Sequence, residues 1–336
     1  MSYAHCFSDV LPRLVFLTSY DDSYMFHFDR GLKLTEIDLG LDCDRRLPRG
    51  FISHAHADHL APHELAFGTP ATLRFYRHRL GARRRVSPIQ FGEPKLWGNL
   101  ELTVWPAGHM LGSSMLRADD GSSSMLYTGD FKLKESLTAE PAELPQTDTL
   151  IMECTFGRPE YRWTSREAVI DQLVNRLERL HKERFQPVIH AYVLGKAQEV
   201  SAILSQRGLR VIHHPLVHEY SQLYEELGCS LGDYQLFNNA ADCDGGVLIA
   251  PPQDQKCQAI HLPRPKRIAV TGWSNDVHAR RRYRVDYSFP LSDHADFDEL
   301  LECVDRVAPK RVLCTHGPKS FVYELRDRGV EASWLE

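Results

Sequence analysis

The sequence lacks three features that would each assign the protein to a class at once. No apolar run approaches the roughly 20 residues that a membrane-spanning helix requires. The N-terminus has no basic segment followed by an apolar stretch, so a secretory signal is not expected. The eight cysteines include no C-x-x-C pair, which favours reduced, buried thiols over a disulfide or zinc-finger framework. We therefore expect a cytoplasmic protein with no membrane role.

The composition is that of an ordinary folded protein, with 336 residues, 43% hydrophobic and 25% charged. Single cores stop growing at roughly 250–300 residues, so a compound architecture is expected. The net charge of −5 argues against anion binding by the whole surface. Two arginine-rich runs nevertheless occur, at residues 74–85 and 278–284. Either could be a solvated helix face, but arginines beside a metal site indicate a polyanionic substrate.

Histidine, with 17 residues in the chain, gathers most densely at residues 54–59, which read HAHADH. Residues 49–53 read as a short buried strand that delivers this cluster to a loop. Histidines two positions apart point the same way from an extended backbone, whereas Asp58 and His59 turn toward a second position nearby. The spacing suggests two adjacent cations. A chance histidine-rich surface loop is the alternative, and the apolar run directly before the cluster weighs against it.

Along the chain, an expected strand is repeatedly followed by a glycine and a residue type that can bind metal. Expected strands end just before His109, Asp130 and His316, and another ends at Glu153. A lone histidine after a strand is usually a capped or core residue, so it is the recurrence that predicts a site at a sheet edge. The expected metal ligands are His54, His56, Asp58, His59, His109, Asp130 and His316.

This ligand set has the composition that a two-metal hydrolase requires. It offers three imidazoles for one cation, an aspartate and two imidazoles for the other, and one carboxylate to bridge them. We expect two divalent ions, with zinc favoured by the histidine-rich set and manganese as the alternative.

The remaining segments divide into two kinds. Residues 14–41 alternate as in a β-meander, and residues 63–80 have helical spacing. From about residue 158 to 289 helices and strands alternate: helices at 165–184 and 196–205, and strands at 187–190, 211–213, 246–250 and 267–271, which suggests a small parallel sheet. Gly195 and Lys196 at a strand-to-helix turn form a candidate phosphate cradle, although such a pair is weak by itself.

These motifs resemble the metallo-β-lactamase fold, through HAHADH at 54–59, Gly108–His109, Gly129–Asp130 and THG at 315–317. Further motifs are similar to the β-CASP nucleases: ECTFG at 153–157, SDHAD at 292–296 and YVLGKAQE at 192–199. The resemblance implies an α/β protein, an αββα sandwich with an inserted α/β β-CASP domain. It places the sandwich in residues 1–160 and 288–336 and the insertion in 161–287.

The resemblance also implies roles for single residues. His294 would be the general acid and Glu153 the carboxylate that holds its imidazole charged, with Asp58 as a further catalytic residue. The alternative for His294 is an additional metal ligand. Asp42 would orient a metal ligand without touching the metal, and Asp38 is a less well-spaced candidate. Substrate phosphates would be bound by Gly195, Lys196, Arg280, Arg281 and Arg282.

Within this group the chain is most similar to bacterial DNA-ligase-associated exonucleases, through its length and residues 156–163. The expected function is a DNA exonuclease in DNA repair that leaves a 5′-phosphate and a 3′-hydroxyl, with DNA favoured over RNA and a functional association with a DNA ligase. An RNA-processing β-CASP ribonuclease is the main alternative. A small-ester hydrolase would not need the long insertion, and a noncatalytic binding module would not need every ligand position filled.

Overall fold

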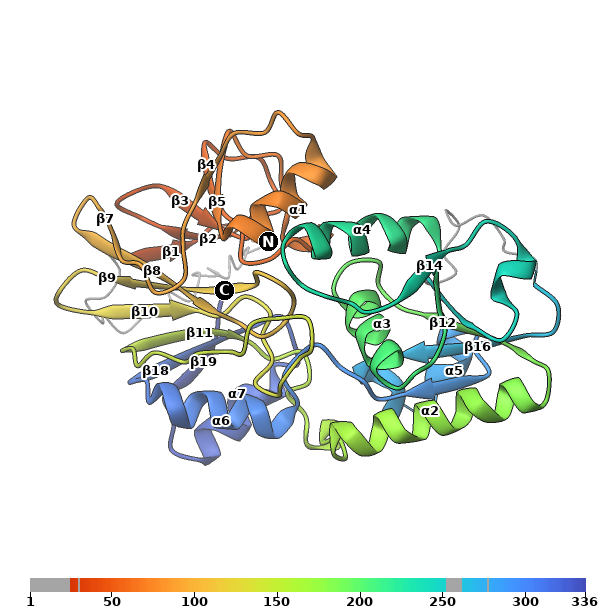
Figure 1. The fold of residues 1–336 in the computed structure, drawn as a ribbon. Coiled ribbons are helices and arrows are strands. Elements are labelled where there is room, and N and C mark those ends of the chain that lie inside the picture. The colour runs from red at the N-terminus through yellow and green to blue at the C-terminus, as the bar shows by residue number, and fades with distance from the viewer. Residues whose placement is uncertain (1–24, 30, 252–261, 277) are drawn as a thin grey trace, which may run out of the picture.

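The computed structural model describes residues 25–29, 31–251, 262–276 and 278–336, so residues 14–24 of the expected meander lie outside the described part. The described chain forms two lobes that lie side by side (Figure 1). One lobe contains two stacked sheets, and the other contains a third sheet with helices packed on it. No helix among the described residues is long and apolar enough to cross a membrane.

The first sheet is mixed and has six strands in sequential order. Its strands β1 to β3 are antiparallel, as expected for a meander, and β3 to β6 are parallel. The strands are β1 (Phe26–Phe28), β2 (Leu32–Leu34), β3 (Leu39–Leu41), β4 (Arg49–Phe51), β5 (Leu65–Gly68) and β6 (Val86–Pro88). Helix α1 (Pro70–Leu80) packs on its outer face through Leu73 and Tyr76.

The second sheet has seven strands in the order β19-β18-β11-β10-β9-β8-β7. They are β7 (Lys95–Trp97), β8 (Leu100–Pro106), β9 (Ser114–Asp119), β10 (Ser124–Tyr127), β11 (Thr149–Glu153), β18 (Arg311–Thr315) and β19 (Ala332–Trp334). Apolar side chains of both sheets meet in one buried cluster, among them Leu39, Phe51 and Val104. Helices α6 (Phe297–Val307) and α7 (Ser320–Asp327) cover the outer face of the second sheet. The predicted αββα sandwich is confirmed.

The third sheet is parallel in all its pairings and follows the order β14-β13-β15-β12-β16-β17. Its strands are β12 (Gln186–His190), β13 (Val211–His213), β14 (Tyr234–Leu236), β15 (Val247–Ala250), β16 (Pro265–Val270) and β17 (Tyr287–Phe289). Helices α2 (Arg166–Lys182) and α3 (Lys196–Gln206) pack on one face together with Val217 of α4 (Pro215–Glu226). The inserted α/β unit is therefore confirmed, while its boundaries at 161 and 287 stay a prediction.

Most expected elements appear where the sequence placed them, and one helix differs. Residues 63–80 do not form one helix, because residues 65–68 pair as β5 between β4 and β6. The helix starts only at Pro70, where Thr69 caps it by accepting a hydrogen bond from the amide of Thr72. Proline suits the first helical position, since its missing N–H would have no partner there.

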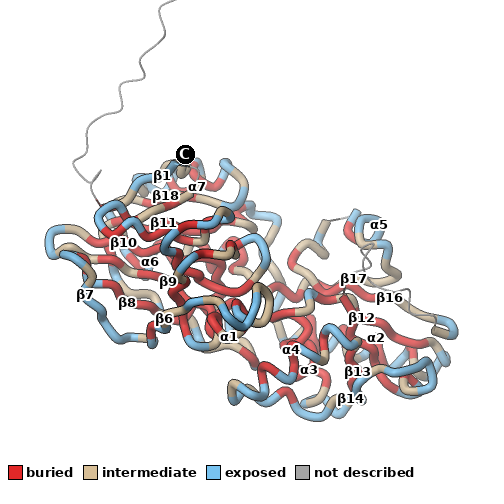
Figure 2. The backbone as a smooth tube through the Cα atoms, turned by 90° about the horizontal axis from the view of Figure 1, so that it is seen from above, coloured by how far each residue is buried: buried red, intermediate tan, exposed pale blue. Residues whose placement is uncertain are grey.

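The two lobes share buried contacts. Buried residues run through the strands of both lobes (Figure 2). Ala55 and Phe75 of the sandwich pack with Leu194, Ala202 and other residues of the insertion in one apolar cluster. Beside it, the carboxylate of Glu199 accepts hydrogen bonds from Lys132 (2.9 Å), Arg166 (2.8 Å) and Lys196 (3.1 Å). Glu199, Lys132 and Lys196 are all buried, so this ion network ties α3 of the insertion to the sandwich.

Candidate metal centre

Loops at one edge of the paired sheets carry the candidate ligands. His54 and His56 follow β4, and Asp58 and His59 lie in the 3₁₀ helix η1 (Ala57–His59). The other ligands come from the second sheet: His109 follows β8, Asp130 follows β10 and His316 follows β18. Strands therefore deliver the ligands, as the sequence pattern predicted.

Two glycines allow these loops to turn. Gly129, before Asp130, has a φ of +55°, and a Cβ there would lie 2.5 Å from Oγ of Ser53. Gly108, before His109, has a φ of +76°, and a Cβ there would overlap the carbonyl oxygen of Lys132. Only glycine meets both demands at low energy.

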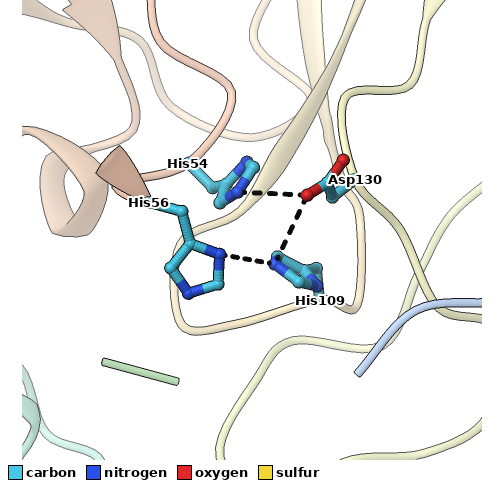
Figure 3. Close-up of side chains that lie close together, drawn as sticks. All are labelled: His54, His56, His109 and Asp130. Atoms are coloured by element: carbon cyan, nitrogen blue, oxygen red, sulfur yellow. Dashed lines mark hydrogen bonds and ion pairs between the residues drawn. The ribbon is translucent and has the colours of Figure 1, made fainter. Parts of the chain in front are cut away.

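The first group of ligand atoms is compact and buried (Figure 3). His54, His56, His109 and Asp130 each offer one atom, and these atoms all lie within 4.8 Å of one another. Nε2 of His54 is fully buried and has no hydrogen-bond partner among the described residues. An orphaned imidazole nitrogen is costly in a folded protein, and a bound cation would satisfy it. The donor set therefore fits a divalent metal ion.

In each of the three histidines of this group, the ring nitrogen that faces away from the other candidate ligands has a hydrogen-bond partner. Nε2 of His56 donates to the carbonyl of Leu194 (3.0 Å), and Nδ1 of His109 donates to the carbonyl of Asp293 (2.8 Å). Nδ1 of His54 lies 3.0 Å from Oγ of Ser53, whose proton goes to Asp42. Such outer contacts fix the tautomer and turn the other nitrogen of each ring toward the metal.

Burial keeps these imidazoles neutral, which is the form that binds metal. It lowers the pKa of His109 to about 3, with help from the neighbouring His294 and His56. It also places the pKa of His54 well below its ordinary value, and His59 lowers it further.

A single carboxylate oxygen faces the rest of the site. Oδ2 of Asp130 lies 3.4 Å from Nε2 of His59, 3.5 Å from that of His54, and 3.9 Å from those of His109 and His294. An oxygen so placed between imidazoles of both groups is suited to bridge two cations.

The second group is more open. Asp58 is a largely exposed side chain whose Oδ2 lies 3.8 Å from Nε2 of His59, and the ring of His316 lies 5.7 Å from that of His59. Nδ1 of His59 donates to Oδ2 of Asp42 (2.9 Å), which also accepts from Tyr127 (3.0 Å). Asp42 thus contacts the ring of the candidate ligand His59, while its role and all seven ligand assignments stay predictions.

The buried carboxylate of Glu153 and the half-buried ring of His294 form a pair at the same site. Nδ1 of His294 lies 2.9 Å from Oε1 of Glu153, whose two oxygens accept the amide N–H groups of Phe131 (3.1 Å) and Thr155 (3.2 Å). Burial alone would lower the pKa of His294, but Glu153 and Asp130 outweigh it and raise the pKa to about 10. A charged imidazole would carry its second proton on Nε2, which faces Asp130.

A cavity of about 390 Å³ opens over these groups. Its walls come from both lobes, since the loop after β12 contributes Tyr192, Val193 and Leu194. Sequence reasoning did not identify the carbonyls of Leu194 and Asp293, and it did not single out Arg79, which also lines the cavity, from its run of arginines. Arg79 belongs to the first arginine-rich run, which was the available sequence signal.

The predicted phosphate-binding residues are not among those that line the cavity. Lys196 is buried and pairs with Glu199 and with Asp293 (3.7 Å), so a phosphate would have to replace these partners. Arg280, Arg281 and Arg282 are exposed on α5 (Ala279–Tyr283), where Arg282 pairs with Asp276. Their role in phosphate binding stays a prediction.

Comparison with known proteins identifies a related domain in the last part of the chain. The family described as "Zn-dependent metallo-hydrolase RNA specificity domain" matches residues 279–334, which include His294 and His316. A solved structure described as a protein of unknown function from Enterococcus faecalis V583 has a TM-score of 0.57 at 14% identity, covering 85% of this chain and 79% of that one. This likeness supports the fold.

Three curated relatives are similar over most of this chain. A probable DNA ligase of Opitutus terrae is 38% identical over 91% of this chain and 30% of its own length. The 5′ exonuclease Apollo of Gallus gallus is 27% identical over 78% of this chain and 57% of its own. Probable RNase MJ4 of Methanocaldococcus jannaschii is 23% identical over 74% and 69%. The chain thus spans about a third of the length of the Opitutus relative. The sandwich, the insertion and the histidine centre, together with these similarities, support assignment of the chain to the β-CASP nucleases of the metallo-β-lactamase fold.

Proposed function

We propose that the protein is a metal-dependent nuclease that hydrolyses phosphodiester bonds, and that its principal substrate is DNA, which it degrades as an exonuclease. One observation carries this proposal. The compact cluster of candidate ligands and the His294–Glu153 pair lie at the same cavity, whose wall includes a loop of the insertion. A metal donor set with an adjacent proton donor is what phosphodiester hydrolysis requires, and the insertion is a surface that a long substrate can contact.

The cofactors of this proposal are two divalent ions, with zinc favoured over manganese by the imidazoles. His54, His56, His109 and Asp130 would hold the first, and Asp58, His59, Asp130 and His316 the second. When bound, such ions orient a phosphate and make a water molecule nucleophilic at neutral pH.

The chain itself supplies the proton for the leaving oxygen. Because Nδ1 of His294 donates to Glu153, the proton to be transferred is on Nε2, which faces the cavity. Glu153 keeps that imidazole charged and in one orientation, since two backbone amides fix its own position. The expected products are a 5′-phosphate and a 3′-hydroxyl.

The choice of DNA is supported by the name of the Opitutus relative, a probable DNA ligase, and exonuclease action by that of the Gallus relative, a 5′ exonuclease. The first name also favours a functional association with a DNA ligase, and a role in DNA repair belongs to the same proposal. Contacts from Gly195, Lys196 and Arg280 to Arg282 to substrate phosphates belong to the same proposal.

RNA processing is the second candidate. The matching family is described as an RNA specificity domain, and the Methanocaldococcus relative is named as a probable RNase. The two candidates use the same centre, so only the substrate separates them.

The deciding experiment incubates the purified protein with end-labelled single-stranded DNA, duplex DNA and RNA, each with and without a 5′-phosphate, under one metal and salt condition. We expect DNA with a single-stranded or recessed end to be degraded faster than RNA. Equal or faster turnover of RNA would assign the protein to RNA processing. No cleavage of any substrate, with metal bound, would contradict the nuclease proposal itself.

A further inference from the structure

Two side chains in the wall of the cavity are not used by the metal centre or the acid pair. Tyr192, from the loop after β12 in the insertion, is 58% exposed although it is a large aromatic residue. Arg79, from α1 in the sandwich, is half-buried and lines the same cavity of about 390 Å³. An exposed aromatic ring and a cation on opposing lobes are the two groups by which proteins hold a single nucleic-acid strand.

The ring of Tyr192 is presented by an anchored backbone. The amide of Ala197 donates to the carbonyl of Tyr192 (3.0 Å), and the carbonyl of Leu194 accepts from the candidate ligand His56 (3.0 Å). The Tyr192 ring itself lies 6.5 Å from the ring of His56. The chain is therefore fixed at Tyr192 and two residues after it, while the aromatic ring remains exposed at the cavity next to the candidate ligands.

Arg79 differs from its neighbours on α1. Arg74 pairs with Glu226 (2.8 Å) and His78 with Glu219 (3.1 Å), so both hold α1 against α4. Arg79 forms no ion pair within the described part of the chain, and it is the only lysine or arginine among the described residues that line the cavity. Its guanidinium is therefore available to a ligand, and its fork geometry suits a phosphate.

We propose that Tyr192 and Arg79 form a nucleotide subsite beside the metal centre: Tyr192 stacks on the base next to the cleaved bond, and Arg79 binds a neighbouring phosphate. This inference rests on the proposed nuclease function and specifies its substrate. A base stacked on Tyr192 has to leave the stack of its own duplex, so the subsite selects single-stranded or frayed ends. Stacking and phosphate contacts of this kind are independent of sequence.

The stacking half is tested by binding a labelled short single-stranded DNA in the presence of chelator, so that the readout does not depend on metal or turnover. Tyr192→Leu should weaken binding about 5- to 150-fold, the range for loss of one stacked base. Tyr192→Phe should bind as wild type, because it keeps the ring. Tyr323→Leu is the matched control, since Tyr323 is 64% exposed on α7, away from the cavity. Wild-type binding by Tyr192→Leu would overturn the stacking role.

The phosphate half is tested by the salt dependence of the same binding. Arg79→Gln should reduce the slope of log K against log salt by about 0.7, the value for one phosphate contact to a single strand. Arg79→Lys should keep the slope, and Arg328→Gln, at an exposed arginine after α7, should leave it unchanged. An unchanged slope for Arg79→Gln would show that Arg79 contacts no phosphate.

These results separate the subsite from the nuclease proposal. If the wild-type protein cleaves nucleic acid while the Tyr192 and Arg79 variants bind and cleave like it, only the subsite is wrong. If the wild type neither binds nor cleaves any nucleic acid, the proposed function is wrong and the subsite with it.

Discussion

Nδ1 of His294 lies 2.9 Å from Oε1 of Glu153, across 141 positions of the sequence. The carboxylate can only accept, so this contact places a proton on Nδ1 and fixes which edge of the ring faces the cavity. A metal ligand would present a bare nitrogen, whereas a charged imidazole presents an N–H. Nδ1 of His59 makes the same contact with Asp42, so the contact orients the ring of His294, and only metal content and turnover separate a proton donor from a metal ligand.

His294→Ala is expected to keep the metal ions and to lose about 10²–10⁴-fold in turnover, because a positioned proton donor contributes about that much. The defect should shrink on a nitrophenyl phosphodiester, whose leaving oxygen needs no proton. Glu153→Gln should show the same rescue in weaker form, since it removes only the group that charges and orients the ring. Elemental analysis and turnover of the two substrates check these expectations. Loss of a metal ion from His294→Ala, or equal defects on both esters, would show that His294 is a ligand.

Asp130→Ala is expected to lower the occupancy of both ions, because one of its oxygens faces the imidazoles of both groups. His316→Ala should lower the occupancy of one ion only and abolish activity with every ester, whatever the leaving group. The measurement is metal content per chain after purification without chelator, where about two ions are expected for the wild type. A single ion in the wild type, unaffected by His316→Ala, would contradict the two-metal assignment.

Asp42→Asn is expected to weaken metal binding about 10- to 100-fold, because Asp42 holds the ring of His59 from behind. Asparagine suits the position, since the backbone φ of Asp42 is +45° and asparagine tolerates that region. Asp38→Asn is a matched control: Asp38 has a φ of +44°, but its side chain is exposed and pairs only with Lys33 among the described residues. Metal affinity measured by competition with a chelator should change in Asp42→Asn alone, and equal affinities would contradict the role.

Glu199→Gln is expected to destabilise the fold by about 3–5 kcal/mol, because it removes the buried anion that Lys132, Lys196 and Arg166 share. Glu302→Gln, which breaks an exposed pair with Arg306 on α6, should change stability by no more than about 1 kcal/mol. The free energy of unfolding in denaturant distinguishes the two. A Glu199→Gln variant as stable as Glu302→Gln would show that the network adds nothing to the junction of the lobes.

The sequence predicted features that depend on local patterns. The expected strand before Gly129–Asp130 is β10, and Ser165 marked the start of α2, because short apolar runs and helix caps are encoded within a few residues. Ligand types after successive strands were enough to place His109 and Asp130 in one site, since strand ends of a sheet converge.

The missing parts depend on contacts between distant segments. The carbonyl of Leu194 holds His56 from 138 positions away, and that of Asp293 holds His109 from 184 positions away. Every residue has a carbonyl, so no residue type marks these groups in the sequence. Lys196 illustrates a different limit: its chemistry suits a phosphate and a buried carboxylate equally, and only the packing of α3 shows that Glu199 is its partner.

The hydrogen bond between the ring of His56 and the carbonyl of Leu194 couples metal binding to the contact between the two lobes. Any opening that carries the loop after β12 away from the sandwich has to break it and release the ligand ring. Because such coupling is reciprocal, an ion that binds more tightly when the ring of His56 is in place stabilises the closed arrangement of the two lobes by the same difference in binding free energy. Metal should therefore slow amide hydrogen exchange at residues 193–198, far along the chain from every ligand in the 54–59 cluster. The insertion thus contributes to the strength of a metal site to which it donates no ligand.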